Sequence, residues 1–285
     1  MRVGNVDGRL NVLAQDGTAV DVEATSRGRF DSDPQAIFDR WEEFCAWVDQ
    51  STLGSGAQVD TARLQAPAPR PRQVFAIGLN YRDHAREAGF EIPSEPVVFT
   101  KYVSSIIGPT GEIELSPGNV DWEVELLAVI GLGGRHIAED RGWDHIAGLT
   151  LGQDISDRTM QFAAPPHQFG LGKSYPGYSP TGPWLVTTDE LQDPNDLEIG
   201  CSVNGQEVQN SRTSQLIFSV PELVAKLSQV VTLLPGDVIF TGTPAGVGTS
   251  QKPPRYLKPG DELASWCTGL GEMRHVFVSP GATST

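Results

Sequence analysis

DWEVELLAVIGL, residues 121–132, is the stretch of sequence that decides the fold. Its second half is an apolar run with β-branched residues, which is typical of a buried strand. Its first half places Asp121, Glu123 and Glu125 two residues apart, so one strand would carry all three acids on one face. The stretch therefore predicts an acidic strand face that lies close to the protein interior.

The neighbouring sequence supplies more strands than helices. From residue 72 onward, apolar or alternating stretches predict strands within residues 73–81, 96–102, 233–243 and 256–265. A helix is predicted near residues 219–230, where Ser219 and Glu222 form a capping box and Leu223, Leu227 and Val230 would face inward. We therefore expect an α+β, β-rich main domain.

The first 70 residues differ in pattern from the rest. Asp7-Gly8 and Asp16-Gly17 are favourable hairpin turns. Asp33-Pro34 begins a predicted helix with one apolar face, formed by Ile37, Phe38, Trp41, Phe44, Cys45 and Val48. The proline-rich segment 65–71 (QAPAPRP) should be extended and stiff. We predict a small N-terminal α+β domain, residues 1–70, and a second domain, residues 71–285.

Composition excludes several classes of protein. The 285 residues carry a formal charge of −15 and no lysine- or arginine-rich run, which argues against a nucleic-acid partner. No apolar stretch is long enough to span a membrane. The three cysteines form neither a zinc-like pair nor a disulfide framework, and the first residues lack the apolar core of a signal peptide. A cytoplasmic location is the expectation.

Two groups of residues could hold a metal. Clustered buried carboxylates repel one another unless a cation compensates, so Glu123 and Glu125 suggest Mg²⁺ or Mn²⁺, which prefer oxygen ligands. Asp154, after the strand-like GLTLGQ, could be a third oxygen ligand. The alternatives are a solvated strand face in an acidic protein and an ordinary Asp-Ser turn.

Other residues suggest catalytic groups. His84 and Glu87 stand three apart, so on a helical turn the carboxylate would orient the imidazole as a general base. Lys173 lies in the glycine-rich GLGKSY, while Arg158 and Gln161 share a helical spacing. In isolation each pattern is more typical of an ordinary charged surface than of a catalytic site. The glycines at 242–248 lack the lysine of a P-loop, and residues 131–136 lack a dinucleotide fingerprint.

Taken together, five motifs occur in one order: NYRDH (80–84), DWEVEL with AVIG (121–131), QDISDRTMQ (153–161), GKSY (172–175) and LLPGDVIFTGTPAGVG (233–248). In these motifs, over about residues 72–278, the sequence resembles the fumarylacetoacetate hydrolase family, specifically the branch of acylpyruvate and diketo-acid hydrolases. The resemblance implies a mixed β-roll catalytic domain, a bound Mg²⁺ or Mn²⁺, and assembly as a homodimer.

The resemblance also implies roles for single residues. Glu123, Glu125 and Asp154 match the metal ligands; His84 matches the catalytic base, Glu87 its orienting carboxylate, and Lys173 the active-site lysine. Arg158, Gln161, Tyr175 and Thr243 are expected to contact the substrate, and residues 78–89 to form a lid. The sequence departs from the family pattern at Gln153, Asp157 and Thr159, and at Pro176 and Gly177 after Tyr175.

The expected function is a divalent-metal-dependent hydrolase. It would cleave a C–C bond in a β-diketone or 2,4-dioxo acid, a small-molecule substrate, with His84 and Glu87 activating water and the metal stabilising an enolate. Enolate chemistry also serves an isomerase, a decarboxylase or a hydratase acting on a related 2-oxo acid, so the fold does not select the reaction. A non-catalytic binding protein is the third possibility.

Overall fold

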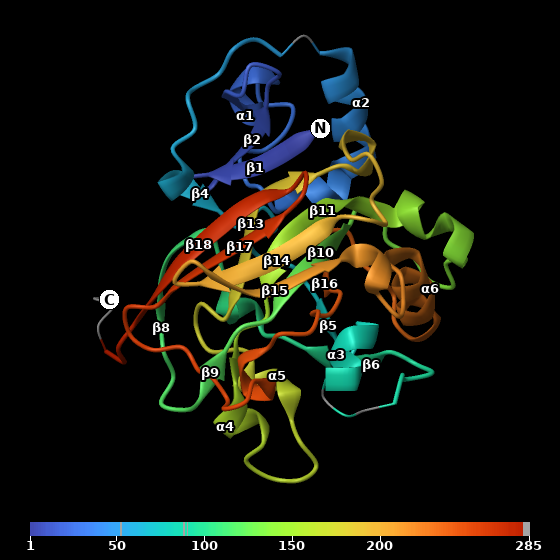
Figure 1. Cartoon of the computed structure of the whole chain (residues 1–285). Coiled ribbons are helices and arrows are strands. Elements are labelled where there is room, and N and C mark those ends of the chain that lie inside the picture. Colours follow the sequence, from blue (N-terminus) through green and yellow to red (C-terminus); the bar gives the residue numbers. More distant parts are fainter. Residues whose placement is uncertain (52, 88, 90, 282–285) are drawn as a thin grey trace.

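The computed structural model describes residues 1–51, 53–87, 89 and 91–281. Its largest element is a mixed sheet of eleven strands (Figure 1). In sheet order these are β3 (Ala19–Asp21), β2 (Arg9–Leu13), β1 (Arg2–Val6), β13 (Ser179–Val186), β11 (Ile146–Gln153), β10 (Val124–Ile130), β16 (Val238–Phe240), β5 (Val74–Gly78) and β6 (Val97–Thr100), with β4 (Leu64–Gln65) beside β1 and β7 (Ile106–Ile107) beside β13.

A second sheet covers one face of the first. Its five strands are, in order, β15 (Gln206–Arg212), β14 (Glu198–Val203), β17 (Glu262–Cys267), β18 (Gly271–Val278) and β8 (Thr110–Glu114). It packs on β13, β11 and β10. A pair of short strands, β9 (Val120–Asp121) and β12 (Ser156–Asp157), stands apart from both sheets. This strand-rich, mixed architecture confirms the expected fold class.

Strand β10 shows why its sequence is apolar from Leu126 to Ile130. Leu126 and Ala128 face the core under the five-stranded sheet, whereas Leu127 and Val129 face a second core, because successive side chains of a strand point to opposite sides. Both faces are covered, so no position can be polar at low cost.

The six α-helices of the described residues are short and peripheral. They are α1 (Val22–Thr25), α2 (Trp41–Gln50), α3 (Arg82–Glu87), α4 (Arg158–Gln161), α5 (Phe169–Gly172) and α6 (Val220–Val230). None of the helices found in the described part of the chain is long and apolar enough to cross a membrane.

The N-terminal segment shares a sheet and a core with the rest of the chain. Strand β1 pairs antiparallel with β13, with Val3 opposite Leu185. Phe38 and Phe44 of this segment lie in the same core as Leu127 and Val129. The expected boundary at residue 70 stays a prediction, and the main sheet is continuous across it.

Two helix predictions need correction. The helix expected after Pro34 is divided, because Arg40 leaves helical geometry (φ −132°, ψ 28°) between a 3₁₀ turn at Ala36–Arg40 and α2. At α6, the Ser219 side chain accepts from the Glu222 amide as predicted, at 3.4 Å. However, Val230 is 79% exposed, since it is the last helical residue and lies beyond the core.

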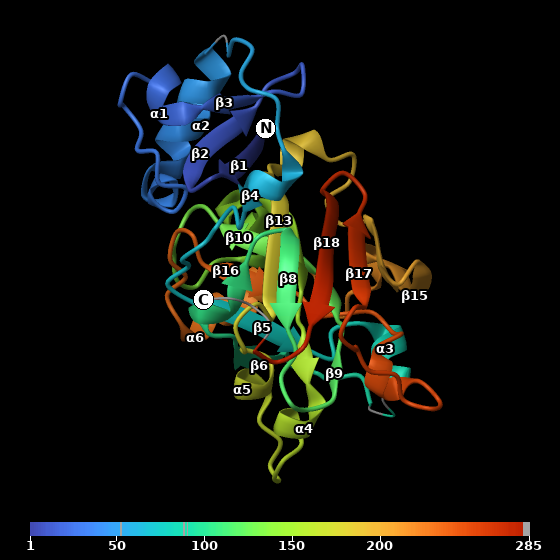
Figure 2. The same cartoon turned by 90° about the vertical axis from the view of Figure 1, so that its left-hand side faces the viewer.

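The two ends of the molecule differ. Helices α3, α4 and α5 with strands β6 and β9 gather at one end, while α1, α2 and β1 to β3 occupy the other (Figures 1 and 2). The first end contains every predicted catalytic residue.

Candidate active site

Three acids converge at one end of the large sheet. Glu123 precedes β10, Glu125 lies on β10, and Asp154 follows β11 directly; an oxygen from each lies within 4.8 Å of the others. The antiparallel pairing of β10 with β11 brings them together, and the Asp154 amide donates to the Glu123 carbonyl at 2.9 Å. All three side chains are buried.

Asp121 does not belong to this cluster. Strand β9 ends at Asp121 and β10 begins at Val124, so the three acids do not share one regular strand face as expected. The Asp121 carboxylate instead accepts from Arg158 Nε at 2.6 Å and from the Thr249 amide at 2.7 Å. The interruption of the strand separates its role from that of Glu123 and Glu125.

Three buried cations neutralise these acids. Lys173 Nζ donates to Glu123 at 2.7 Å and to Asp154 at 2.6 Å, and Arg158 Nη2 donates to Glu123 at 2.6 Å. Lys101 Nζ donates to Asp154 at 2.6 Å and to the Lys173 carbonyl. Sequence reasoning missed Lys101. The signal was present, because this lysine directly follows the apolar run PVVFT, where a solvated side chain is not expected.

Burial and neighbouring charges shift the pKa values of the individual acids differently. Burial, together with the charges of Asp154 and Glu123, raises the pKa of Glu125 well above its ordinary value. Burial also acts to raise the pKa of Glu123, but the charges of Lys173, Arg158 and His84 outweigh it and lower that pKa to about 2. Burial raises the pKa of Asp121 to about 6. Glu125 is thus the acid with the least compensation.

The residues present fit a divalent cation. Three convergent carboxylates supply only oxygen donors, the set that Mg²⁺ and Mn²⁺ prefer. Glu125 accepts one backbone hydrogen bond, from the Gly242 amide at 2.8 Å, and no side-chain cation contacts it among the described residues. A bound cation would stabilise its charged form.

The predicted dyad is assembled beside this cluster. On helix α3, His84 Nδ1 lies 3.3 Å from a Glu87 carboxylate oxygen, and Glu87 accepts from the Gly246 amide at 3.1 Å. The helix is held by Arg82, whose guanidinium donates to the Leu216 carbonyl, and it is followed by Gly89 at φ +75°. His84 therefore has a fixed orientation, with Nε2 free of the carboxylate.

One cavity of about 360 Å³ joins these groups. Its walls include His84, Glu123, Glu125, Lys173, Arg158, Gln161 and Thr243. Arg158 also donates to Gln161 Oε1 at 2.8 Å, and Thr243 Oγ1 accepts from Gln209 at 2.8 Å. Three of the four predicted substrate contacts thus lie at the cavity, although Arg158 is already bonded to two acids.

Tyr175 is the exception. Its ring lies 5.2 Å from that of Tyr178, and it lines a separate hollow with Pro176 and Ser116 rather than the catalytic cavity. The expectation that Tyr175 contacts substrate stays a prediction.

Comparison with known proteins identifies relatives over most of the chain. Residues 73–278 match the family model described as fumarylacetoacetate (FAA) hydrolase C-terminal. The human protein named oxaloacetate tautomerase FAHD2A, mitochondrial, is 47% identical over 208 residues, which are 72% of this chain. The match covers 66% of the human protein, slightly less than two thirds of its length.

Solved structures of similar sequence also share the fold of this chain. A Mycobacterium smegmatis crystal structure, described provisionally as an HpcE protein, is 53% identical with a TM-score of 0.95, covering 98% of this chain and 100% of that chain. Fumarylpyruvate hydrolase from Pseudomonas aeruginosa, in complex with Mn²⁺ and pyruvate, is 33% identical with a TM-score of 0.67, covering 73% of this chain and 90% of that chain.

Proposed function

This chain belongs to the fumarylacetoacetate hydrolase family, and we propose that it is a divalent-metal-dependent enzyme that hydrolyses a C–C bond in a 2,4-dioxo acid. The observation that carries the proposal is that one cavity is lined by two of the three clustered acids, Glu123 and Glu125, and by His84. Asp154 completes the acid cluster behind the wall, and Glu87 lies 3.3 Å from His84 Nδ1. A metal site alone serves many reactions, whereas an oriented histidine beside it provides the base that hydrolysis needs.

The metal site is supplied by the three acids. Glu123, Glu125 and Asp154 would hold Mg²⁺ or Mn²⁺, and a bound divalent cation supplies Lewis-acid stabilisation of enolate charge. Lys173 and Lys101 fix the Asp154 carboxylate from both oxygens, and Arg158 and Lys173 fix Glu123 in the same way. Because every one of these donors is buried, the ligand geometry is set before substrate arrives.

The dyad moves the proton. Glu87 accepts from His84 Nδ1–H, which leaves Nε2 as the acceptor that takes a proton from the attacking water. The water oxygen adds to the 4-carbonyl carbon, and the C3–C4 bond then breaks to give a carboxylic acid and pyruvate. We propose that α3 orders over the bound substrate as a lid and excludes bulk water from this step.

Keto–enol tautomerisation of a 2-oxo acid is the second candidate. The specific observation in its favour is the 47% identity to a protein named oxaloacetate tautomerase, higher than the 33% identity to the fumarylpyruvate hydrolase. The same residues suffice, since His84 could move a proton between carbon and oxygen. Isomerisation and decarboxylation of related acids use the same enolate.

Product analysis separates these reactions. Acylpyruvates and oxaloacetate are incubated with the enzyme and Mg²⁺ or Mn²⁺, and products are identified by mass. Release of pyruvate plus a new carboxylic acid supports hydrolysis. Accelerated enol decay without any change of mass supports tautomerisation and contradicts the hydrolase proposal.

Assembly and location complete the proposal. We propose a homodimer, on the family resemblance alone, and sedimentation showing a monomer at micromolar concentration would contradict it. A cytoplasmic location stays a prediction, because the human relative carries the word mitochondrial in its name.

A further inference from the structure

The cavity has two chemically different walls. Its lining includes charged groups, namely Glu123, Glu125, Lys173 and His84, and a set of apolar side chains. We define the apolar wall as Val97, Phe99, Phe162 and Phe169. Val97 and Phe99 alternate along β6, so both point to the same side of that strand.

The apolar wall begins at the catalytic groups. Lys173 Nζ lies over the Phe99 ring, 5.4 Å from its centroid, and Phe99 meets Phe169 edge-on with centroids 5.5 Å apart. Phe162 meets the His167 ring edge-on at 5.0 Å. One edge-on ring pair therefore begins at Lys173, and a second lines the same cavity.

This wall is incompletely covered by the chain. Phe162 is 45% exposed and Val97 is 36% exposed, a costly state for two apolar side chains beside a catalytic cavity. A substrate seated against the acids and Lys173 would extend its far end along them. Covering the wall would contribute binding energy only if that far end is apolar.

The charges around the acid cluster also favour a substrate with a single carboxylate. The buried charges of the site are three cations, Lys101, Arg158 and Lys173, and four acids, Asp121, Glu123, Glu125 and Asp154. Their balance is one negative charge. A divalent cation would turn it into one positive charge, which the single carboxylate common to all 2-oxo acids offsets.

A second carboxylate would have no cation to meet it. The other basic side chains on the described walls are His84, which faces Glu87, and His167, which packs on Phe162. The hydroxyls of Thr249 and Ser250 also line the cavity, but a carboxylate held against phenylalanine rings without a cation is disfavoured.

We infer that the substrate is a 2-oxo monocarboxylate whose far end is an aryl or other planar apolar group, and that the apolar wall selects it over dicarboxylates. The inference rests on the proposed function for the position of the acid end. It assigns specificity to Val97, Phe99, Phe162 and Phe169, and it disfavours oxaloacetate-like substrates.

The test uses two matched pairs of compounds. Cleavable 2,4-dioxo acids carry either phenyl or carboxylate on carbon 4. Non-cleavable partners, 2-oxo-4-phenylbutanoate and 2-oxopentanedioate, lack the 4-carbonyl, so calorimetry with Mg²⁺ measures their affinity without turnover. We expect the phenyl compound to be favoured by at least about 10-fold in both kcat/KM and Kd.

Three variants test whether the apolar wall causes the preference for the phenyl compound. Phe162→Arg places a cation on the exposed edge of the wall and should shift the phenyl-to-carboxylate ratio of Kd by about 10-fold toward the diacid. Phe162→Leu should keep the parent preference. Leu171→Arg adds the same charge on neighbouring helix α5, 64% exposed and outside the cavity lining, and should leave the ratio unchanged.

The outcomes separate this inference from the proposed function. Equal or tighter binding of 2-oxopentanedioate by the parent overturns the inference, as does an equal shift in Phe162→Arg and Leu171→Arg. Tighter binding of the phenyl compound with no cleavage of either dioxo acid supports the inference and overturns the hydrolase proposal.

Discussion

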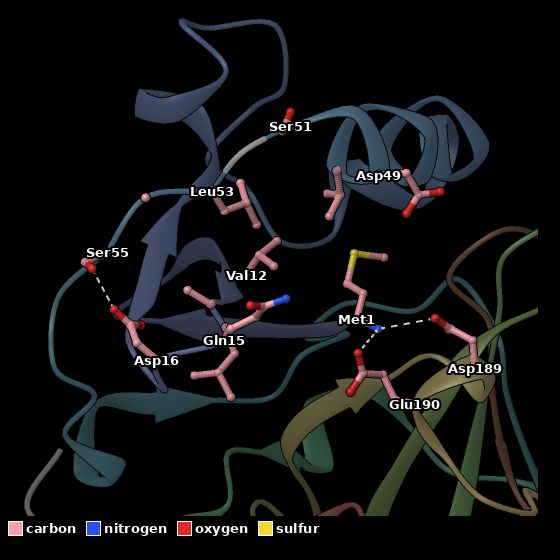
Figure 3. A pocket seen from close by; sticks show the side chains of 14 residues that line it. Met1, Val12, Gln15, Asp16, Asp49, Ser51, Leu53, Ser55, Asp189 and Glu190 are labelled. Carbon is pink, nitrogen blue, oxygen red and sulfur yellow. Dashed lines mark hydrogen bonds and ion pairs between the residues drawn. The ribbon is translucent and has the colours of Figure 1, made fainter.

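Two acid-lined hollows lie at opposite ends of the molecule, and the larger of the two is not the catalytic cavity. The hollow at the N-terminal end measures about 600 Å³, against about 360 Å³ for the catalytic cavity. Its acids are Asp16, Asp49, Asp189 and Glu190, and Figure 3 shows them spread around the rim. Acid content and size alone would favour this hollow.

Burial and convergence distinguish the two. The side chains of Asp189 and Glu190 are 79% and 43% exposed, whereas those of Glu123 and Asp154 are 9% and 1% exposed. Asp16 accepts from Ser55 at 2.6 Å, so its charge is met locally by a hydroxyl (Figure 3). Among the described residues, three convergent acids with the distances of a metal site occur only in the catalytic cavity.

Burial, rather than the number of acids, distinguishes the carboxylates of the catalytic cavity from those of the N-terminal hollow. Exposed acids are stabilised by water wherever they stand, and screening makes their mutual repulsion small. Buried acids must be compensated, so the chain that brings them together also supplies Lys101, Arg158 and Lys173. Four experiments test whether this difference holds.

The largest expected effect is on catalysis. His84→Ala should lower kcat by roughly 10²–10⁴-fold with an acylpyruvate, the usual scale for a positioned general base. Metal affinity, measured by calorimetry, should stay the same because His84 is not a ligand. Near-normal turnover, or loss of the metal, would contradict the assignment of His84 as the base.

Removing a buried cation should cost stability. Lys101→Met leaves the Asp154 Oδ1 oxygen without its ammonium donor in a site with no exposed surface. Breaking a buried pair from one side costs about 3–5 kcal/mol, to be measured as the free energy of unfolding in urea. As the matched exposed case, Lys226→Met breaks the Lys226–Glu95 pair, and it should change the free energy of unfolding far less. Equal losses of unfolding free energy in the two variants would contradict the distinction between buried and exposed charges.

Removing one acid should weaken the metal. Glu125→Gln takes away one of three oxygen ligands and should raise the calorimetric Kd for Mg²⁺ by about 100-fold, at least the scale seen when a residue that merely supports a ligand is lost. Asp49→Asn, in the N-terminal hollow, is the control and should leave that Kd unchanged. Unaltered Mg²⁺ affinity in Glu125→Gln would remove Glu125 from the ligand set.

The smallest effect concerns a buried histidine far from the metal site. Burial lowers the pKa of His275 on β18 to about 4, and among the described residues its Nδ1 has no hydrogen-bond partner. Below about pH 6.5 the unfolded chain takes up a proton that the folded chain refuses, so stability falls as pH falls. Between pH 7 and pH 5 this linkage amounts to about 2 kcal/mol.

His275→Gln should remove that part of the pH dependence, as judged from urea unfolding at both pH values. The control is His136→Gln, at an exposed histidine bonded to Gln229, which should preserve the parent slope. An unchanged slope in His275→Gln would show that the histidine is protonated in the folded state.

Local patterns in the sequence predicted much of the structure. The apolar run of β10, the cap at Ser219 and the i, i+3 spacing of His84 and Glu87 all concern residues close in sequence. The candidate metal ligands could also be identified from the sequence, because the family motif indicated Asp154, which strand periodicity did not.

Long-range contacts could not be predicted in the same way. Lys101 reaches Asp154 and Lys173 through pairings that span more than 50 residues, and no local pattern reports them. The shared sheet of β1 and β13 was hidden because each strand reads locally as an ordinary one.

The pairing of β1 with β13 also affects when the N-terminal segment can finish folding during synthesis. Val3 meets Leu185, so the first strand lacks its β13 neighbour until the ribosome has produced most of the chain, although β2 and β4 can pair with it earlier. At synthesis rates of about 5–20 residues per second, the wait is roughly 10 to 40 s. During that interval Val3, Leu10 and Phe38 lack the part of their core that Leu127 and Leu185 supply, so the nascent N-terminal segment exposes apolar surface that the finished protein buries.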